Sequence, residues 1–212
     1  MENTFVHFLV LADSYYREDE KGKKTWYSPT EVTTEKDEKG RIVKAWLTSD
    51  NTAVTHGGMT KMSKSKKNVV DPDDIITNYG ADAVRWFMLS DSPPERDLPW
   101  SEAGIEGCSR FVHRLWRLFG QFDSSASGED KALARKTHQT IAAVAGDIEA
   151  LSFNKAVARL YELTGATEKA KPSASRNEAI RSILLMSSPM MPHLAEEAWE
   201  RLGGEGLIAE AT

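Results

Sequence analysis

The residues best suited to chemistry are four lysines that fall within seven consecutive positions. They belong to the stretch HGGMTKMSKSKKNVVDP at 56–72, with two glycines in front of them and an Asp-Pro pair behind. Lysines this close repel one another, so we expect a solvated loop unless an anion gathers the charge. Ammonium groups and serine hydroxyls together suit the oxygens of a polyphosphate. The lysines and serines in question are Lys61, Ser63, Lys64, Ser65, Lys66 and Lys67.

Two interpretations of this loop stay open on chemical grounds alone. It is either an ordinary lysine-rich surface loop or a polyphosphate site that hinges at Gly57 and Gly58. The 212 residues contain no GxxxxGK[ST] stretch, which excludes a P-loop. The net charge of −5 argues against a protein covered in basic charge for nucleic acid, although it permits a local positive patch.

The composition narrows the class of protein. A hydrophobic content of 40% over 212 residues is enough to bury a core in one or two domains. The single cysteine, Cys108, cannot form an internal disulfide, which favours a reducing, cytoplasmic location. The five histidines are far apart without HExxH spacing, so we expect no protein-bound metal. No run approaches the roughly 20 apolar residues of a membrane helix, and the N-terminus reads poorly as a secretion signal, so no membrane partner is expected.

The elements in front of the loop read as strands and turns. β-branched and apolar residues flank the turn at 37–40, which predicts a hairpin with Gly40 at a positive φ. A second turn at 49–51 is followed by a third short strand at 52–55 that leads into the glycines.

The elements behind the loop read as helices. Asp71 and Pro72 begin a helix that Gly80 ends, and a second piece at 81–90 runs up to the prolines at 93 and 94. From 101 onward, apolar residues recur every three or four positions on four or five amphipathic helices, which predicts an antiparallel bundle. The fold class is therefore α+β and mostly α: a small hairpin region, the lysine loop and a helical bundle. The expected inward positions are Ile105, Cys108, Phe111, Val112, Leu115, Trp116, Phe119, Phe122, Leu133, Ile141, Val144, Ile148, Leu151, Phe153, Val157, Leu160 and Tyr161.

The letters of the lysine loop resemble a known signature. Residues 61–65 read KMSKS, as in the second signature of the class I aminoacyl-tRNA synthetases, and Lys66, Asn68 and VVDP follow as in that family. Further stretches resemble a leucyl-tRNA synthetase in their order, so the resemblance covers roughly residues 9–212. These stretches are WYSPTEVTTEKDEKGRIVKAW, GADAVRWFMLSDSPPERDLPWSEAGIEG, FVHRLWRLF, FNKAVARLYELT and LLMSSPMMPHLAEEAWERL.

The resemblance implies an ATP-dependent ligase that activates leucine and joins it to tRNA(Leu). In the family, the signature residues bind the ATP phosphates while the leucine carboxylate attacks the α-phosphate and pyrophosphate leaves. Carried over to this sequence, the catalytic residues are Lys61 and Lys64, with Lys64 as the main phosphate contact. The implied cofactor is ATP, with Mg²⁺ carried by the nucleotide. The implied ATP-binding set is Lys61, Met62, Ser63, Lys64 and Ser65.

The resemblance also predicts a division into two domains. Residues 1–100 would be the C-terminal part of the catalytic domain, and residues 101–212 a truncated anticodon-binding-type helical bundle. The family's His-Ile-Gly-His signature, leucine pocket and editing domain lie upstream in a complete member, so this chain alone is expected to make no leucyl-adenylate without a missing upstream polypeptide. Residues 1–8, MENTFVHF, do not resemble the family's approach to this region. Two alternatives remain: a noncatalytic tRNA-binding or partner module, and another class I synthetase of the branched-chain or methionine group.

Several other residues invite a functional interpretation. Arg110, Arg114 and Arg117 lie three and four apart and could face the tRNA backbone, although a solvated helix face is the commoner explanation. We expect Asp82 to cap a helix. Exposed apolar surface or self-association is expected around Trp26, Trp46 and residues 5–11. Packing or surface roles, rather than base stacking or catalysis, are expected of Trp86, Phe87, Cys108, His113, Trp116 and Trp199, and the acids Asp73 and Asp74 are expected in a first helical turn.

Overall fold

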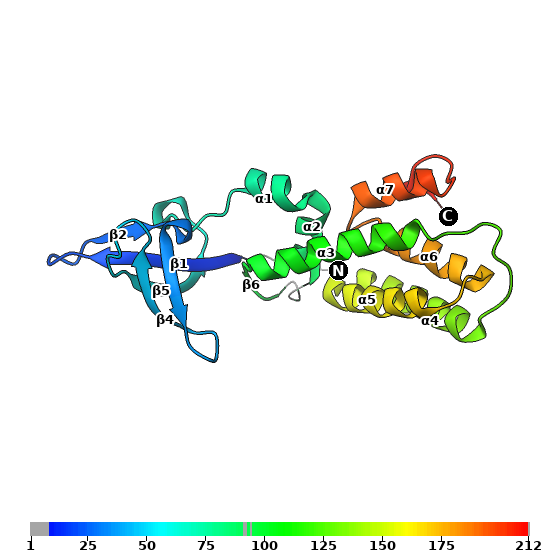
Figure 1. Ribbon diagram of the computed structural model, residues 1–212, viewed down its shortest axis with the longest axis horizontal. Helices are drawn as coiled ribbons and strands as arrows, with labels where there is room; N and C mark the ends of the chain where they lie inside the picture. Colours follow the sequence, from blue (N-terminus) through cyan, green and yellow to red (C-terminus); the bar gives the residue numbers. More distant parts are fainter. Residues whose placement is uncertain (1–8, 91–92, 94, 212) are drawn as a thin grey trace, which may run out of the picture. The chain divides into compact units, whose positions relative to one another are not determined.

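The computed structural model describes residues 9–90, 93 and 95–211, which form two compact units. One unit comprises residues up to 74 together with 95–100, and the other comprises 75–94 and 101 onward. Strands fill the first unit and helices the second, so the predicted α+β, mostly α fold class is confirmed (Figure 1). The prolines expected to end the second helix lie partly outside the described residues, as do residues 5–8.

The strand unit contains two small sheets. Its main sheet has the order β2-β1-β5, with β6 added in parallel to the start of β1. The second sheet is the antiparallel pair of β3 and β4. The strands are β1 (Val10–Glu18), β2 (Lys24–Tyr27), β3 (Val32–Lys36), β4 (Ile42–Leu47), β5 (Thr55–Lys61) and β6 (Leu98–Pro99), with short 3₁₀ turns η1 (Pro29–Glu31) and η2 (Lys64–Lys66).

The hairpin predicted around 37–40 is confirmed as β3 and β4. Gly40 has a φ of 75°, and the Asp37 carboxylate accepts hydrogen bonds from the backbone of Lys39 and Arg41. The backbone N–H and then the side chain of Arg41 lower the pKa of Asp37. The turn chemistry in the sequence was therefore sufficient to place this hairpin.

The strand that leads into the lysines differs from the prediction. The short strand expected at 52–55 is reduced to a single bridge between Trp46 and Ala53, and the true strand, β5, runs through both glycines to Lys61. Gly57 and Gly58 together oppose one residue of β1, Ser14, so they form a β-bulge rather than the hinge of a loop. Both need to be glycine, because a Cβ on Gly57 would lie 2.7 Å from the Ser14 hydroxyl and Gly58 has a φ of +77°.

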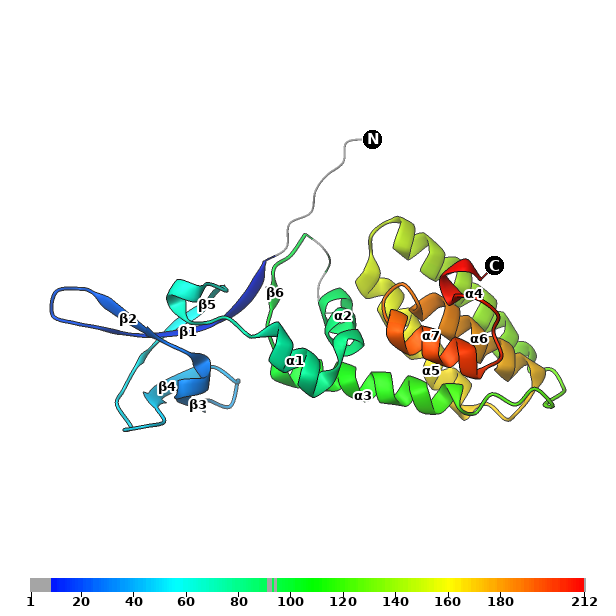
Figure 2. The ribbon, with the colours of Figure 1, turned by 90° about the horizontal axis from the view of Figure 1, so that it is seen from above.

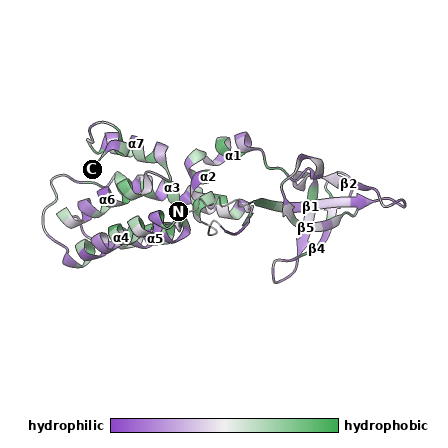
Figure 3. Ribbon diagram, turned by 180° about the vertical axis from the view of Figure 1, so that it is seen from behind, coloured by the Kyte–Doolittle hydropathy of each residue, from purple (hydrophilic) through white to green (hydrophobic). Residues whose placement is uncertain are grey.

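The helical unit forms a bundle. Helix α2 packs on α3 and α5, and α4, α5 and α6 pack on one another, joined by the short connections 150–152 and 170–173 (Figures 1 and 2). Each of α4–α6 carries both hydrophobic and hydrophilic residues, as amphipathic helices do (Figure 3). The helices are α1 (Pro72–Tyr79), α2 (Ala81–Ser90), α3 (Glu102–Phe119), α4 (Lys131–Glu149), α5 (Phe153–Lys169), α6 (Ala174–Ser187) and α7 (Pro192–Arg201), with the 3₁₀ turn η3 (Ile208–Glu210) near the C-terminus.

The predicted inward faces are confirmed for α3 and corrected for α4. In α3 the buried residues include Ile105, Cys108, Phe111, Leu115 and Phe119, whereas Val112 and Trp116 are half-buried, as is Phe122 just beyond the end of the helix. In α4, Ile141 is 37% exposed, and Leu151 just beyond the helix is 53% exposed. The inward face uses Thr137 and Thr140 instead, because threonine can be buried when its hydroxyl bonds the preceding turn, as Thr137 does to Leu133 O at 2.9 Å.

The two ends of α5 are defined by different features. The helix continues through Gly165 to Lys169. Ser152 stands at its N-cap, although the Ser152 side chain makes no capping hydrogen bond.

Candidate functional site

The lysines lie on a tight turn that follows directly from β5. We call residues 61–67 the lysine turn: Lys61 is the last residue of β5, η2 spans Lys64–Lys66, and Lys67 closes the turn with a left-handed φ of 53°. The expectation of one open loop is therefore wrong for Lys61, whose backbone belongs to the sheet. The Met62 N–H donates to Val10 O at 3.2 Å, which fixes the start of the turn against β1.

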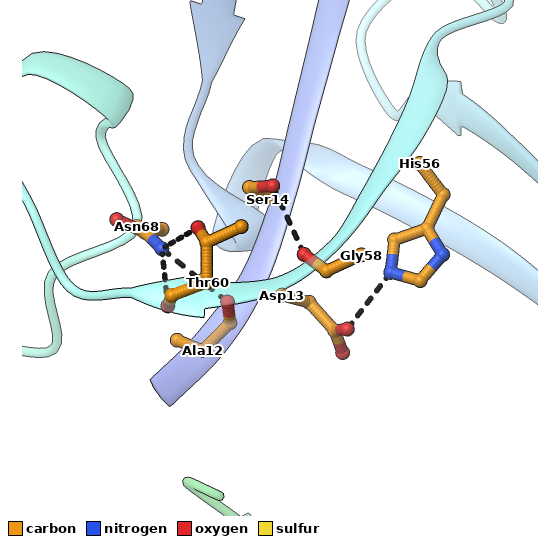
Figure 4. Close-up of polar contacts among 7 residues, drawn as sticks. All are labelled: Ala12, Asp13, Ser14, His56, Gly58, Thr60 and Asn68. Atoms are coloured by element: carbon orange, nitrogen blue, oxygen red, sulfur yellow. Dashed lines mark hydrogen bonds and ion pairs between the residues drawn. The ribbon is translucent and has the colours of Figure 1, made fainter. Parts of the chain in front are cut away.

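Asn68 ties the lysine turn to the sheet. Its side chain is fully buried, and its Nδ2 group lies 3.3 Å from Ala12 O and from both the carbonyl and hydroxyl oxygens of Thr60 (Figure 4). Its Oδ1 accepts a 2.9 Å hydrogen bond from Ser63 N. A buried amide without partners would cost about 1–3 kcal/mol, so this complete set of partners fixes the fold of the chain here.

The two serines of the turn contact each other. Ser63 Oγ and Ser65 Oγ are 2.7 Å apart, and Ser63 makes no side-chain capping hydrogen bond to η2. Ser65 is exposed, as are Lys61 and Lys64. The sequence-predicted residues 61–65 are thus brought together on one short segment.

The positive charge of the turn has no internal counter-charge. Within the part of the chain that the structure describes, Lys61, Lys64 and Lys67 form no ion pair, and residues 57–70 include no Asp or Glu. Lys66 is half-buried, and its ammonium lies 5.5 Å from the ring centroid of Trp26 on β2. Three exposed ammonium groups on an anchored turn can bind an anion of high charge, such as a polyphosphate.

A titratable group that the sequence analysis missed lies at the bulge. His56 Nε2 is 2.8 Å from Asp13 Oδ1, and both side chains are partly buried (Figure 4). The His56 ring also contacts Tyr15, with centroids 5.4 Å apart. Burial, and secondarily the charge of Asp13, raises the pKa of Tyr15 to about 12. His56 is more than 40 positions away from Asp13 and Tyr15, and the pairing of β1 with β5 brings it next to them.

The predicted arginine stripe lies on α3, and two of its three members have structural partners. Arg114 makes a forked ion pair with Glu168 of α5, with Nε at 2.8 Å, and Arg110 pairs with Glu106 at 2.8 Å. The hydrogen bond to Glu168 raises the pKa of Arg114, and the Arg114 hydrogen bond lowers that of Glu168. Among the described residues Arg117 forms no ion pair, so it has the most available charge of the three.

Asp82 caps a helix, as predicted, but not its own. Its buried carboxylate accepts from Leu194 N at 2.6 Å and contacts His193 Nδ1 at 2.9 Å, so it caps the start of α7. On the same helix as Asp82, Arg85 donates to Pro189 O and Met190 O. Asp82 and Arg85 of helix α2 therefore hold the connection between α6 and α7 in place. No local pattern in the sequence predicts these long-range contacts.

The remaining aromatic and polar candidates have packing or surface roles. Trp86 is fully buried and donates to the Tyr161 hydroxyl at 3.1 Å, and Phe87 and Trp199 are also buried. Trp116 is half-buried beneath the guanidinium of Arg201. Cys108 is buried, His113 is exposed, and the exposed acids Asp73 and Asp74 lie in the first turn of α1.

Trp26 and Trp46 in the strand unit are partly exposed. Trp26 and Trp46 are both half-buried, and Trp26 packs on Tyr16 with ring centroids 5.2 Å apart. The expected exposed apolar surface is therefore present only in part at these two side chains. Leu9 is 37% exposed, and self-association stays a prediction.

The described residues contain neither a cluster of metal-ligating side chains nor a helix that could span a membrane. Across 9–90, 93 and 95–211, no group of three or more His, Cys, Asp or Glu side chains is arranged to hold a metal ion. Within the same ranges, no helix has both the length and the apolar character needed to cross a membrane.

Comparison with known proteins identifies two family segments. Residues 46–101 match the family described as tRNA synthetases class I (I, L, M and V), and residues 130–212 match the anticodon-binding domain of tRNA ligase. The lysine turn lies within the first segment, and α4–α7 lie within the second.

Individual relatives match nearly the whole chain. The leucine–tRNA ligase of Novosphingobium aromaticivorans is 64% identical over 208 residues, which cover 98% of this chain and 24% of the relative. That of Sphingopyxis alaskensis is 59% identical over 200 residues, 93% of this chain and 23% of the relative. The chain therefore spans about a quarter of the length of these relatives. Among solved structures, the Agrobacterium radiobacter LeuRS in a ternary complex with tRNA and LeuAMS matches 70% of this chain and 22% of its own, with a TM-score of 0.63 and 28% identity.

Proposed function

The chain belongs to the leucine–tRNA ligase family, and we propose that its lysine turn binds the phosphates of ATP during leucine activation. The observation that carries the proposal is the unpaired charge: three exposed lysines without an ion pair in the described structure, on a turn fixed to a sheet. An ordinary solvated lysine loop would need neither the fixed backbone nor the serines between the lysines.

The proposed chemistry is the formation of leucyl-adenylate. The leucine carboxylate attacks the α-phosphate of ATP, the bond from that phosphorus to the bridging oxygen breaks, and pyrophosphate leaves with additional negative charge. A phosphoryl transfer of this kind asks the protein mainly for position and for positive charge on the leaving group. In this proposal Lys64 and Lys61 supply the charge, and the segment Lys61, Met62, Ser63, Lys64 and Ser65 binds ATP.

The two catalytic lysines differ in how they are held. The backbone of Lys61 belongs to strand β5, whereas the backbone of Lys64 belongs to the 3₁₀ turn η2. Contacts that strengthen as charge develops on pyrophosphate raise the rate, rather than only the affinity for ATP. The absence of acids at 57–70 fits a site in which Mg²⁺ arrives with the nucleotide.

We further propose the domain assignment and partners that accompany this chemistry. Residues 1–100 would belong to the catalytic domain and residues 101–212 to an anticodon-binding-type bundle, with ATP, leucine and tRNA(Leu) as ligands in the cytoplasm. The tRNA contact would use Arg117 more than Arg110 or Arg114, whose charges are already paired. We also propose that these residues alone form no adenylate, because the relatives they match are about four times as long.

The test is leucine-dependent exchange of labelled pyrophosphate into ATP. The chain is assayed alone, and then after addition of the upstream part of the Novosphingobium aromaticivorans ligase. We expect no exchange alone and exchange in the mixture, with leucine preferred over isoleucine, valine and methionine. Exchange with another amino acid would indicate a different class I specificity. No exchange in the mixture, together with tRNA binding by the chain, would indicate a noncatalytic module and contradict the proposal.

A further inference from the structure

Asn68 contacts three separate segments of the strand unit at once. Its Nδ2 group faces Ala12 O on β1 and the oxygens of Thr60 near the end of β5 (Figure 4). The same group lies 3.5 Å from Lys61 O, at the last residue of β5. Its Oδ1 accepts from Ser63 N in the lysine turn. The side chain is 0% exposed, so water does not compete for these contacts.

The backbone conformation of Lys67 makes this arrangement possible. A left-handed φ of 53° reverses the chain after η2 and returns Asn68 beneath residues 61–63. Because non-glycine residues rarely adopt this conformation, the contacts of Asn68 must maintain it. The backbone of the lysine turn thus folds around the buried side-chain amide of Asn68.

These contacts fix the backbone on both sides of Met62. The carbonyl of Lys61 and the N–H of Ser63 both lie against the same amide, so the backbone positions from which Lys61 and Lys64 extend are set relative to the sheet. In the described part of the chain, none of the Asn68 hydrogen bonds involves a lysine side chain. A rigid base with free ammonium groups lets the charges follow phosphate oxygens without repositioning the backbone.

We propose that Asn68 is a positioning residue for leucine activation: it holds the base of the lysine turn to β1 and β5 so that Lys61 and Lys64 meet the pyrophosphate as it leaves. The inference rests on the proposed function of the lysine turn. It assigns Asn68 an effect on turnover that a buried polar residue with only a structural role would lack.

Ser14 provides a matched control in the same sheet. It is also fully buried, and its hydroxyl donates to Gly58 O at 3.0 Å, but among the described residues no hydrogen bond joins its side chain to the lysine turn. Replacing either residue by alanine removes a buried polar group from the β1–β5 pair. Only the replacement of Asn68 releases Ser63 N and Lys61 O.

The experiment uses a hybrid enzyme, in which this chain replaces the matching segment of the full-length Novosphingobium aromaticivorans ligase. Asn68→Ala, Ser14→Ala and Lys64→Ala are compared for kcat and for the KM of ATP in leucine-dependent pyrophosphate exchange. Asn68→Ala is expected to lower kcat on the order of 10-fold and to change the KM of ATP much less, because a misplaced group loses transition-state contact. Ser14→Ala is expected to change kcat less than about 2-fold.

Hydrogen exchange on the 212-residue chain gives a second readout that does not depend on activity. Asn68→Ala should raise the exchange rate of the Ser63 amide at least about 10-fold over Ser14→Ala. If Asn68→Ala fails to fold, Thr60→Val removes only the hydroxyl contact and should lower kcat in the same direction by a smaller factor.

The outcomes separate this inference from the proposed function. A fall in kcat for Lys64→Ala, with Asn68→Ala no worse than Ser14→Ala, overturns the positioning role and leaves the phosphate role intact. An unchanged kcat for Lys64→Ala overturns both. An equal loss in kcat and in ATP affinity for Asn68→Ala also contradicts positioning, because it indicates uniform binding.

Discussion

Several arginines of the helical unit are paired with protein oxygens, whereas, among the described residues, the exposed lysines of the lysine turn are not. In the helices, Arg159 pairs with Asp147 at 2.6 Å, and Arg201 pairs with Glu197. Even the buried Arg176 donates its guanidinium N–H groups to protein oxygens. In the turn, three lysines within seven positions have no such partner in the described structure. The chain has 32 acidic residues, yet none of them lies at 57–70. The paired arginines therefore stabilise the packing of the helices, whereas the lysines of the turn are available to bind an anionic ligand.

The largest effect expected from the comparison is on the stability of the helical unit. Trp86→Ala should lower the free energy of unfolding by about 3–5 kcal/mol, because it empties a fully buried site between α2, α3 and α5 and breaks the hydrogen bond to Tyr161. The measurement is denaturant unfolding followed by circular dichroism. Trp116→Ala, at a half-buried position, should cost clearly less, and equal costs would contradict the core assignment.

The next effect concerns the buried carboxylate that joins α2 to α7. Asp82→Ala should cost about 1–3 kcal/mol, because it leaves the Leu194 N–H without its cap inside the unit. Thermal unfolding measures the loss. His193→Ala changes the exposed partner of the same carboxylate and should cost less than half as much. If the two variants lose the same stability, the contact with His193 rather than the cap provides the stabilisation.

A pH-dependent effect is expected in the strand unit. The pKa of Tyr15 is about 12 in the folded chain and near 10 when unfolded, so the unfolded state loses this proton first. The stability from Tyr15 is complete below pH 10 and is lost as pH rises toward about 12, by on the order of 2 kcal/mol. Unfolding experiments across this range should show the loss, and Tyr15→Phe should reduce it. An unchanged alkaline slope in Tyr15→Phe would contradict the assignment.

The smallest expected effect is the change in stability when one charged side chain is removed from the helical unit or from the lysine turn. Arg114→Met should cost up to about 1 kcal/mol at neutral pH, since it leaves Glu168 unpaired, whereas Lys64→Met should cost nothing measurable. Arg114 lowers the pKa of Glu168, so the pair stabilises the fold above the ordinary glutamate pKa and is lost as pH falls through the lowered value. The difference between Arg114→Met and the parent should therefore shrink in acid. A persistent difference would mean that packing, not charge, was lost.

Local signals in the sequence predicted much of the fold. The hairpin turn at 37–40, the helix start at Asp71 and Pro72, and the apolar face of α3 follow from residue type and spacing alone, and the structure confirms them. The bundle followed from the number of amphipathic helices and their short connections.

The errors occur where long-range contacts override local preference. Gly57 and Gly58 favour a flexible loop locally, but pairing with β1 places them in a strand. Asp82 caps a helix as expected, but that helix is α7, which begins 110 positions later and which the residues around Asp82 do not indicate. Asn68 could be recognised as part of the signature, but its role needed the contacts with Ala12 and Ser63, since no sequence spacing reveals them.

The most direct test of the phosphate-binding account is Lys64→Ala in the hybrid enzyme, with Lys155→Ala on α5 as the control for an exposed lysine. Leucine-dependent pyrophosphate exchange should fall at least about 100-fold in kcat for Lys64→Ala, with a much smaller change in the KM of ATP. Lys155→Ala should match the parent enzyme. If Lys64→Ala and Lys155→Ala exchange pyrophosphate at the same rate, the lysine turn does not stabilise the leaving group and the account is contradicted.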